Sequence, residues 1–204
     1  MKKLVFSMVA ASALMGSAFA EESGGFIGIS IGGAAALQVS GPSNASSSTT
    51  VAGGFKGGYQ AFFTQASGVR FYFSLLAAYG VFPNTQQNPP VPPGQLPLIM
   101  DLYALADINA DYLFNWSVGH QNSAGLFVGF FTGGMLSLPQ FNLPGAGGRI
   151  TTGVTAGLNL GIRGVISSNH QVEFGVKTGA NFLIKNDFTM GAVIAGLASY
   201  AYKF

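Results

Sequence analysis

The feature that most constrains the fold is a strict alternation of side chains along residues 98–114. Even-numbered positions in this stretch are apolar or aromatic, whereas its three acids, Asp101, Asp107 and Asp111, all stand at odd-numbered positions. A helix would scatter these acids over roughly 200° of arc among apolar side chains, but a strand places them together on one face. The stretch is therefore predicted to be a β-strand with one apolar face and one charged face.

Seven further stretches are predicted to be strands from the same two-residue period. Most of them combine an apolar face with a polar one. In 123–136 both parities are apolar, so the pattern assigns neither of its faces. The predicted strands besides 98–114 are 24–39, 51–64, 69–82, 123–136, 151–166, 171–184 and 189–204.

Three connections between these strands are long: 40–50, 83–97 and 137–150. They are rich in Ser, Thr, Gly or Pro and are predicted to be exposed loops. The connections after the second, fourth and sixth strands are short, although the short one after the seventh breaks the alternation. Transmembrane barrels have short periplasmic turns and longer outer loops. We therefore expect the long connections to face outward, where they could meet a surface or host ligand.

The first twenty residues have the features of a secretory signal peptide. Lys2 and Lys3 precede an apolar stretch, 4–15, and Ala18-Phe19-Ala20 forms a cleavage site of the small-x-small type. We expect residues 1–20 to be removed after export through the inner membrane. Residues 21–204 would then form a single mature domain.

Low charge without a long apolar run indicates a membrane barrel. Charged residues make up 8% of the chain, against about 25% in typical soluble domains. No apolar run reaches the roughly 18 residues of a spanning helix. Barrel strands hide their apolarity in alternation, and closure leaves no unpaired backbone edge in hydrocarbon. The sequence therefore predicts an all-β fold, an eight-stranded antiparallel transmembrane β-barrel of the outer-membrane type, surrounded by outer-membrane lipids.

Most charges in the predicted strands lie opposite the apolar face of their strand. An eight-stranded interior is just wide enough for side chains to fill, and buried charges of opposite sign are expected to pair. We therefore expect a lumen packed by a charge network. The alternative is a narrow, porin-like path for ions or small solutes. The predicted network consists of Lys56, Arg70, Asp101, Asp107, Asp111, Arg163, Glu173 and Lys177.

The remaining composition argues against nucleic-acid binding and catalysis. Without Lys2 and Lys3, the nine Lys and Arg fall to seven and equal the seven Asp and Glu, so no basic field would attract nucleic acid. The chain has no Cys, and its two histidines, His120 and His170, stand in predicted short turns. A Gly-x-Ser-x-Gly motif, a metal-ligand cluster and a phosphate-binding loop are all missing from the sequence. We expect no enzyme activity, metal or cofactor.

Aromatic side chains gather where strands would end on the periplasmic side, as an interfacial girdle does. A last strand that ends in Phe, with Tyr two residues earlier, resembles the terminal strand of bacterial outer-membrane barrels. That resemblance implies that Tyr200, Tyr202 and Phe204 form an assembly signal for the barrel-assembly machinery. The whole aromatic set is Phe63, Tyr112, Phe114, Trp116, Tyr200, Tyr202 and Phe204.

A more specific likeness covers residues 159–204. Asn159-Leu-Gly-Ile-Arg163, His170-Gln-Val-Glu-Phe-Gly-Val-Lys177 and the Tyr-x-Tyr-x-Phe end resemble the carboxyl-terminal part of the Helicobacter outer membrane protein family. That family includes adhesins and porin-like members. The resemblance implies an integral outer-membrane barrel with a structural or adhesin-like surface-interaction role. The amino-terminal domain that serves adhesion in larger members has no counterpart in this sequence, so we expect only the barrel to be carried over.

Overall fold

The computed structural model describes residues 23–40, 44–83, 98–119, 121–139, 150–184 and 189–204, which form eight antiparallel strands closed into one barrel. Each strand pairs with its neighbour in sequence, and β1 pairs with β8 to complete the ring. The predicted all-β, eight-stranded barrel is therefore confirmed. The strands are β1 (Gly24–Ser40), β2 (Asn44–Phe62), β3 (Ser67–Pro83), β4 (Leu98–Val118), β5 (Ser123–Pro139), β6 (Thr151–Ile166), β7 (His170–Ile184) and β8 (Thr189–Lys203).

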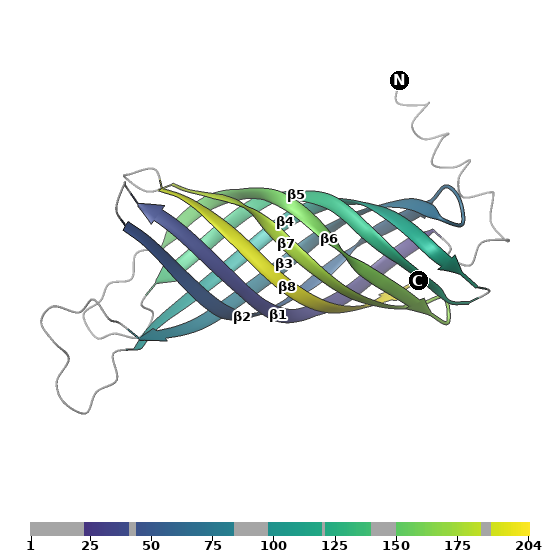
Figure 1. The fold of residues 1–204 in the computed structure, drawn as a ribbon, viewed down its shortest axis with the longest axis horizontal. Coiled ribbons are helices and arrows are strands. Elements are labelled where there is room, and N and C mark those ends of the chain that lie inside the picture. The colour runs from purple at the N-terminus through teal and green to yellow at the C-terminus, as the bar shows by residue number, and fades with distance from the viewer. Residues whose placement is uncertain (1–22, 41–43, 84–97, 120, 140–149, 185–188) are drawn as a thin grey trace, which may run out of the picture.

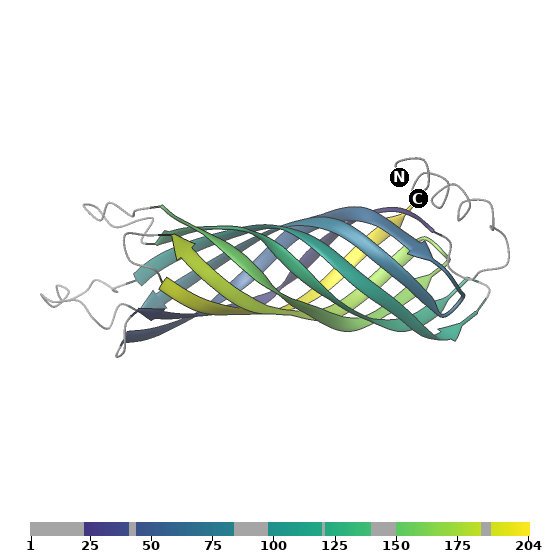
Figure 2. The same cartoon turned by 90° about the horizontal axis from the view of Figure 1, so that it is seen from above.

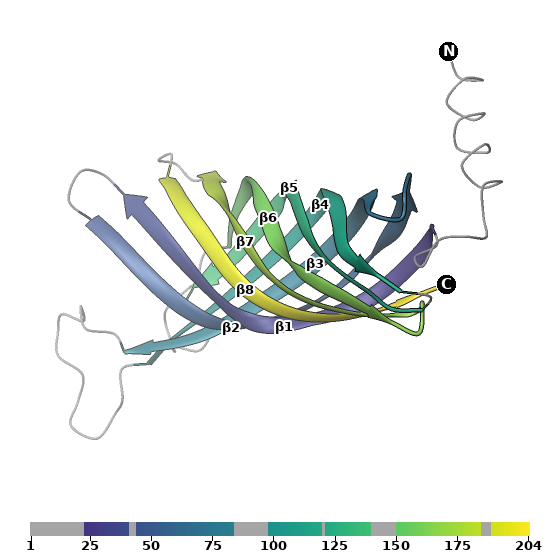
Figure 3. The same ribbon diagram turned by 45° about the vertical axis from the view of Figure 1, so that its right-hand side comes forward.

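The barrel is elongated, and its strands are strongly tilted against the long axis (Figures 1 and 2). Closing a sheet into a barrel requires such a tilt. Turned by 45°, the strands are seen to curve into a continuous wall (Figure 3). One end holds the start of β1, the end of β8 and the connections β2–β3, β4–β5 and β6–β7. We call this the short-turn end.

Burial alternates along the strands in the way that the sequence pattern predicts. In β6, Thr155, Asn159 and Arg163 point inward and are buried, whereas Val154 and Leu158 point outward and are more than half exposed. The outward side chains of the other strands are likewise apolar or aromatic over most of their length. This outer face is the one that lipid would cover. Within the described ranges, no helix is long and apolar enough to cross a membrane.

The structure assigns the two faces of β5, which the sequence pattern left open. Phe127, Phe131 and Met135 point into the lumen and are at most 7% exposed, whereas Val128 and Phe130 point outward. The inward positions that alternate with these three large side chains are Gly125, which precedes Phe127, and Gly129 and Gly133, which lie between them. Both parities are apolar because the inner face of β5 supplies large side chains that fill the lumen, while its outer face meets lipid.

The predicted loop at 40–50 is wrong for most of its length. Residues 44–50 belong to β2 and pair with residues 34–40 of β1. The Thr50 hydroxyl also donates to the Ala34 carbonyl, at 3.1 Å. A polar composition shows that a segment cannot form part of an apolar core. A strand at the end of a barrel needs no such core, because backbone hydrogen bonds to the neighbouring strand are enough to hold it. Residues 41–43 lie outside the described part of the chain.

The other predicted connections are also shorter than expected. Pro83 is the last residue of β3, and Ser137–Pro139 extend β5, so the predicted loops at 83–97 and 137–150 each lose residues to a strand. The rest of both loops, 84–97 and 140–149, and the predicted signal peptide, 1–20, lie outside the described residues. The connection predicted at 115–122 begins only after Val118, because β4 continues through a register shift between Asn115 and Ser117.

Candidate functional site in the lumen

Seven of the eight predicted network residues point into the lumen, and each is at most 8% exposed. They come from five strands, β2, β3, β4, β6 and β7. The eighth, Asp101, belongs to β4, but its side chain lies outside the described part of the structure. The seven are Lys56, Arg70, Asp107, Asp111, Arg163, Glu173 and Lys177.

Arg70 lies at the centre of the site and is fully buried. Arg70 and Asp111 are direct partners in the β3–β4 register, which places Arg70 Nη2 2.7 Å and Nε 3.3 Å from Asp111 Oδ2. The guanidinium Nη1 donates to Glu173 Oε1. Three rings surround the guanidinium carbon, with centroids at 4.9 Å for Tyr72, 5.1 Å for Phe127 and 5.6 Å for Phe26. Two carboxylates and three rings thus enclose a charge that would otherwise be costly to bury.

Glu173 joins three strands. Its carboxylate accepts hydrogen bonds from Arg70, from Lys56 Nζ and from Gln171 Nε2. Arg163, the register partner of Glu173 on β6, donates to Gln171 Oε1 at 3.1 Å. Removing Glu173 would therefore leave buried cations on β2 and β3 without their shared counter-charge.

Lys177 forms the second centre of charge. Its ammonium donates to Asp107 Oδ2 at 2.8 Å, to Asn109 Oδ1 at 3.1 Å and to the Ser74 hydroxyl at 3.4 Å. The same ammonium lies 4.3 Å from the centroid of the Phe131 ring. All three donors of the ammonium therefore have an acceptor, as a buried lysine requires.

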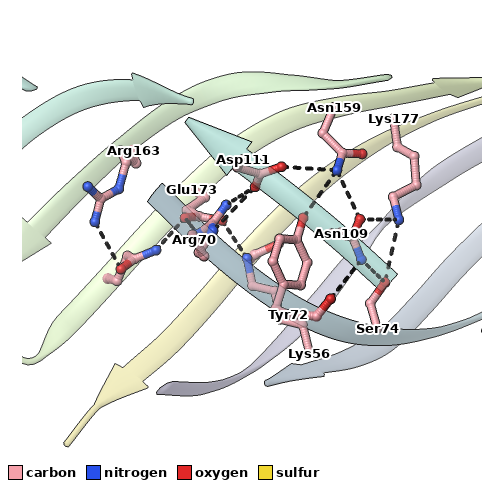
Figure 4. Close-up of polar contacts among 12 residues, drawn as sticks. Lys56, Arg70, Tyr72, Ser74, Asn109, Asp111, Asn159, Arg163, Glu173 and Lys177 are labelled. Carbon is pink, nitrogen blue, oxygen red and sulfur yellow. Dashed lines mark hydrogen bonds and ion pairs between the residues drawn. The ribbon is translucent and has the colours of Figure 1, made fainter. Parts of the chain in front are cut away.

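Asn159 connects the two centres (Figure 4). Its amide nitrogen donates to Asn109 Oδ1 at 2.9 Å, to Asp111 Oδ1 at 3.2 Å and to the Tyr72 hydroxyl at 3.4 Å. The predicted network contained only charged residues and missed these neutral members. They stand at the same parity as the charges on their strands, so parity could have found them. We call the whole set the lumen network: Lys56, Arg70, Tyr72, Ser74, Asp107, Asn109, Asp111, Asn159, Arg163, Gln171, Glu173 and Lys177.

The lumen beyond this network, away from the short-turn end, contains two apolar clusters beside buried polar side chains such as Thr155 and Asn181. Four buried alanines form one cluster there, and Leu105, Phe131 and Met135 form a second. Leu76 packs against both clusters. The four alanines are Ala34, Ala52, Ala78 and Ala195.

Little open space remains inside the described part of the barrel. One cavity of about 50 Å³ is lined by Lys56, Tyr72 and Asn159 among others, and another of about 40 Å³ is lined by Ala34 and Asn181 among others. Leu76 borders both. Because a water molecule needs roughly 10–15 Å³, each cavity has room for only a few water molecules.

His170 is not part of this site. His170 lies at the short-turn end, where its Nδ1 is 2.7 Å from the exposed Tyr200 hydroxyl. His120 lies outside the described residues. Among the residues that the structure does describe, no three His, Cys, Asp or Glu side chains group as metal ligands would.

Comparisons with known proteins agree with this architecture. The family described as Helicobacter outer membrane protein matches residues 54–204. Neisserial surface protein A has the same fold, with a TM-score of 0.55 and 16% identity over 90% of this chain and 100% of that one. Lower similarity is found to Ail, the attachment invasion locus protein of Yersinia pestis, with a TM-score of 0.43, 16% identity and coverage of 89% and 99%. The chain matches none of the curated proteins.

Proposed function

The chain belongs to the Helicobacter outer membrane protein family, and from this premise we propose that it is a closed outer-membrane barrel with a structural or surface-interaction role. Its interior serves stability, and its contacts with partners are made at its ends and on its outer face. The outer face meets outer-membrane lipids, because its exposed side chains are apolar all along the strands.

The observation that carries this proposal is the packing of Arg70. A conducting path would have to pass a guanidinium that is 0% exposed and is held by Asp111, Glu173 and three aromatic rings. Moving Arg70 aside would leave the Asp111 carboxylate without its cation in a low-dielectric lumen, at a cost of several kcal/mol, and would leave Glu173 paired with Lys56 but no longer with Arg70. A second barrier follows, because Leu76 and the apolar clusters separate the two small cavities.

The surface role rests on the family and on the filled interior. A lumen without room for a solute leaves the connections outside the membrane as the region available to a partner. The stretches 84–97 and 140–149 are proline- and glycine-rich and carry Arg149 as their single charge. A partner of these connections would be recognised through backbone, proline and amide groups, as an adhesin-like contact requires no charge complementarity.

The C-terminal strand has a separate role in this proposal. Tyr200, Tyr202 and Phe204 are 43%, 46% and 71% exposed on the outer face at the short-turn end. Aromatic side chains at this level suit the membrane interface. We assign them to recognition by the barrel-assembly machinery and to anchoring at the interface.

Planar-bilayer conductance tests the closed lumen. The protein is refolded in detergent and inserted into bilayers, and we expect no steady unitary conductance. Asp107→Asn, which removes a lumen charge but keeps the shape of the side chain, should be equally silent. A reproducible conductance of the unmodified protein that changes in size or ion selectivity with Arg70→Gln would contradict the proposal. It would support a narrow porin-like channel instead.

A further inference from the structure

The connections at the short-turn end are joined to one another by hydrogen bonds. In the β6–β7 turn, the Ser168 amide donates to the Gln121 carbonyl at 2.8 Å, and the Ser167 amide donates to Asn122 Oδ1 at 3.1 Å. Both acceptors belong to the β4–β5 connection. The neighbouring connection therefore holds the β6–β7 turn in place.

This β6–β7 turn has an unfavourable backbone conformation. Ser167 and Ser168 have φ values of 52° and 64°, so two consecutive residues with side chains occupy the left-handed region. Asn-Gly is the usual sequence for such a hairpin turn. The conformation costs roughly 1–3 kcal/mol per residue and persists only where the surroundings enforce it. The strained turn places the next residue, Asn169, beside the end of β8.

Asn169 holds the end of the last strand at two points. The Lys203 amide donates to the Asn169 carbonyl at 2.8 Å, and Asn169 Nδ2 donates to the Lys203 carbonyl, also at 2.8 Å. These bonds extend the β7–β8 ladder one pair beyond His170 and Tyr202. In this extra pair the donor to the Lys203 carbonyl is the side-chain amide of Asn169 and not its backbone amide.

The residue after Lys203 is fixed against the first strand. The Phe204 amide donates to the Gly25 carbonyl at 2.9 Å. The Phe204 ring lies over Gly25, where a Cβ would come within 2.8 Å of Cε2. Asn169 on one side and Gly25 on the other thus hold the final two residues in the seam between β8 and β1.

The seam itself contains few side chains that could specify its register. Small residues face each other along its middle, as at Gly28–Ala201, Gly33–Gly196 and Ala34–Ala195. Ser30 and Ser199 share a side-chain hydrogen bond across the seam, at 2.8 Å. Register is weakly specified in glycine-rich strands, and a slip of two residues would keep every side chain on its own face.

We propose that Asn169 is a clasp that fixes the register in which β8 closes the barrel onto β1. The strained turn positions Asn169. The two hydrogen bonds to Lys203 fix the position of β8 along β7, and the contact of Phe204 with Gly25 fixes the position of β8 along β1. The clasp is a conformational device of the fold, independent of whether the lumen conducts.

Disulfide trapping measures the register directly, because the chain has no cysteine of its own. Ala198→Cys is combined in turn with Ile31→Cys, its partner in the register, and with Ile29→Cys or Gly33→Cys, which lie two residues away. Direct partners are about 4.5–5.5 Å apart between Cα atoms and can be bridged, whereas diagonal neighbours at about 7–8 Å cannot. After refolding and mild oxidation, only the pair with Ile31→Cys should cross-link.

Asn169→Ala is then introduced into all three pairs. We expect the yield of cross-links to Ile29→Cys or Gly33→Cys to rise about fivefold. This is the factor by which the loss of one hydrogen bond shifts the equilibrium between the two registers. If this variant fails to refold, Asn169→Asp is used, since it keeps the size and the backbone bond and removes only the Nδ2 donor. The control is Thr64→Ala at the same end, which removes side-chain hydrogen bonds to the Ala66 and Ser67 amides within the β2–β3 turn and leaves the β6–β7 turn and its contacts with β8 unchanged.

Two results would overturn the proposal. One is a folded Asn169 variant, either Ala or Asp, whose cross-links stay confined to the pair with Ile31→Cys. The other is an equal slip in Thr64→Ala, because the register would then depend on the short-turn end in general and not on the clasp.

Discussion

At the scale of single residues, most charges of the lumen network have more than one hydrogen-bonding partner. Lys177 reaches three acceptors and Arg70 reaches two carboxylates, all from neighbouring or facing strands. Buried ion pairs of this kind contribute little net stability when compared with an apolar pair of the same volume. Removing only one partner of such a pair is strongly destabilising, because the other charge then stays buried without a counter-charge.

The pair formed by Lys177 and Asp107 allows this to be measured. Lys177→Met leaves the Asp107 carboxylate buried without its cation and should lower the free energy of unfolding by about 3–5 kcal/mol. Adding Asp107→Leu should recover much of that loss. Urea unfolding of the refolded barrel in lipid vesicles gives the four free energies of the cycle. Additive effects of the two changes would show that the pair is not coupled.

Sequence reasoning at this scale located the charges but not their partners. Parity predicts which side chains enter the lumen, because it depends on local backbone geometry alone. The pairing of Arg70 with Asp111 follows from the β3–β4 register, and that of Lys56 with Glu173 joins strands that are not neighbours. Neither the register nor a contact across the lumen is encoded in a two-residue period. The neutral members Asn109 and Asn159 share the parity of the charges on their strands and were missed because the prediction considered charged side chains alone.

At the scale of the strand, β3 has one face toward lipid and the other toward the packed lumen. Leu75 points outward and is 49% exposed to the region of the lipid, whereas Leu76 points inward and packs against both apolar clusters. The two residues are chemically identical neighbours. Only Leu76 has packing partners that cannot be replaced by lipid.

These two leucines therefore make a matched comparison. Leu76→Ala should destabilise the barrel by about 2–5 kcal/mol, since it removes buried contacts and leaves a cavity. Leu75→Ala leaves a gap that acyl chains can fill and should cost less. Urea midpoints of the two variants in lipid vesicles decide between them, and an equal loss in both would show that the apolar clusters add nothing to stability.

The strands that were predicted well are those with contrasting faces. Residues 151–166 were predicted to the residue, because most inward positions of that strand differ in polarity or size from their outward neighbours. The start of β2 was missed, because Asn44–Thr50 are polar on both faces. This part of β2 is held by backbone pairing with β1. Backbone pairing makes no demand on side-chain polarity, so the sequence of this segment shows no alternation.

At the scale of the whole molecule, closure joins residues from opposite ends of the chain. Ser30 and Ser199 are 169 positions apart and share a hydrogen bond across the β1–β8 seam. Each strand has two neighbours, so no strand can leave without opening two ladders. An open edge in hydrocarbon is unfavourable by several kcal/mol for each unpaired group, and the barrel should therefore unfold as one unit.

The single tryptophan provides a local probe for this cooperativity. Trp116 lies at the short-turn end and is 56% exposed on the outer face. Its fluorescence and the far-ultraviolet circular dichroism of the whole barrel should change with one common urea midpoint. Leu76→Ala, which acts away from Trp116 beside the apolar clusters, should shift both signals together. A fluorescence transition that precedes the loss of strand signal would contradict a single unit.

The aromatic rings in the lumen have a consequence for how this barrel can evolve. The Phe127 ring lies against Gly161 and Gly175, where an added Cβ would come within 2.6 Å and 2.7 Å of its Cζ. The Phe131 ring meets Gly157 in the same way, at 2.8 Å. A large residue on β5 and small residues on β6 and β7 thus occupy one shared volume. At Gly175 the ring is the nearest obstacle, so among related sequences a smaller residue at 127 should be accompanied by a larger one at 175.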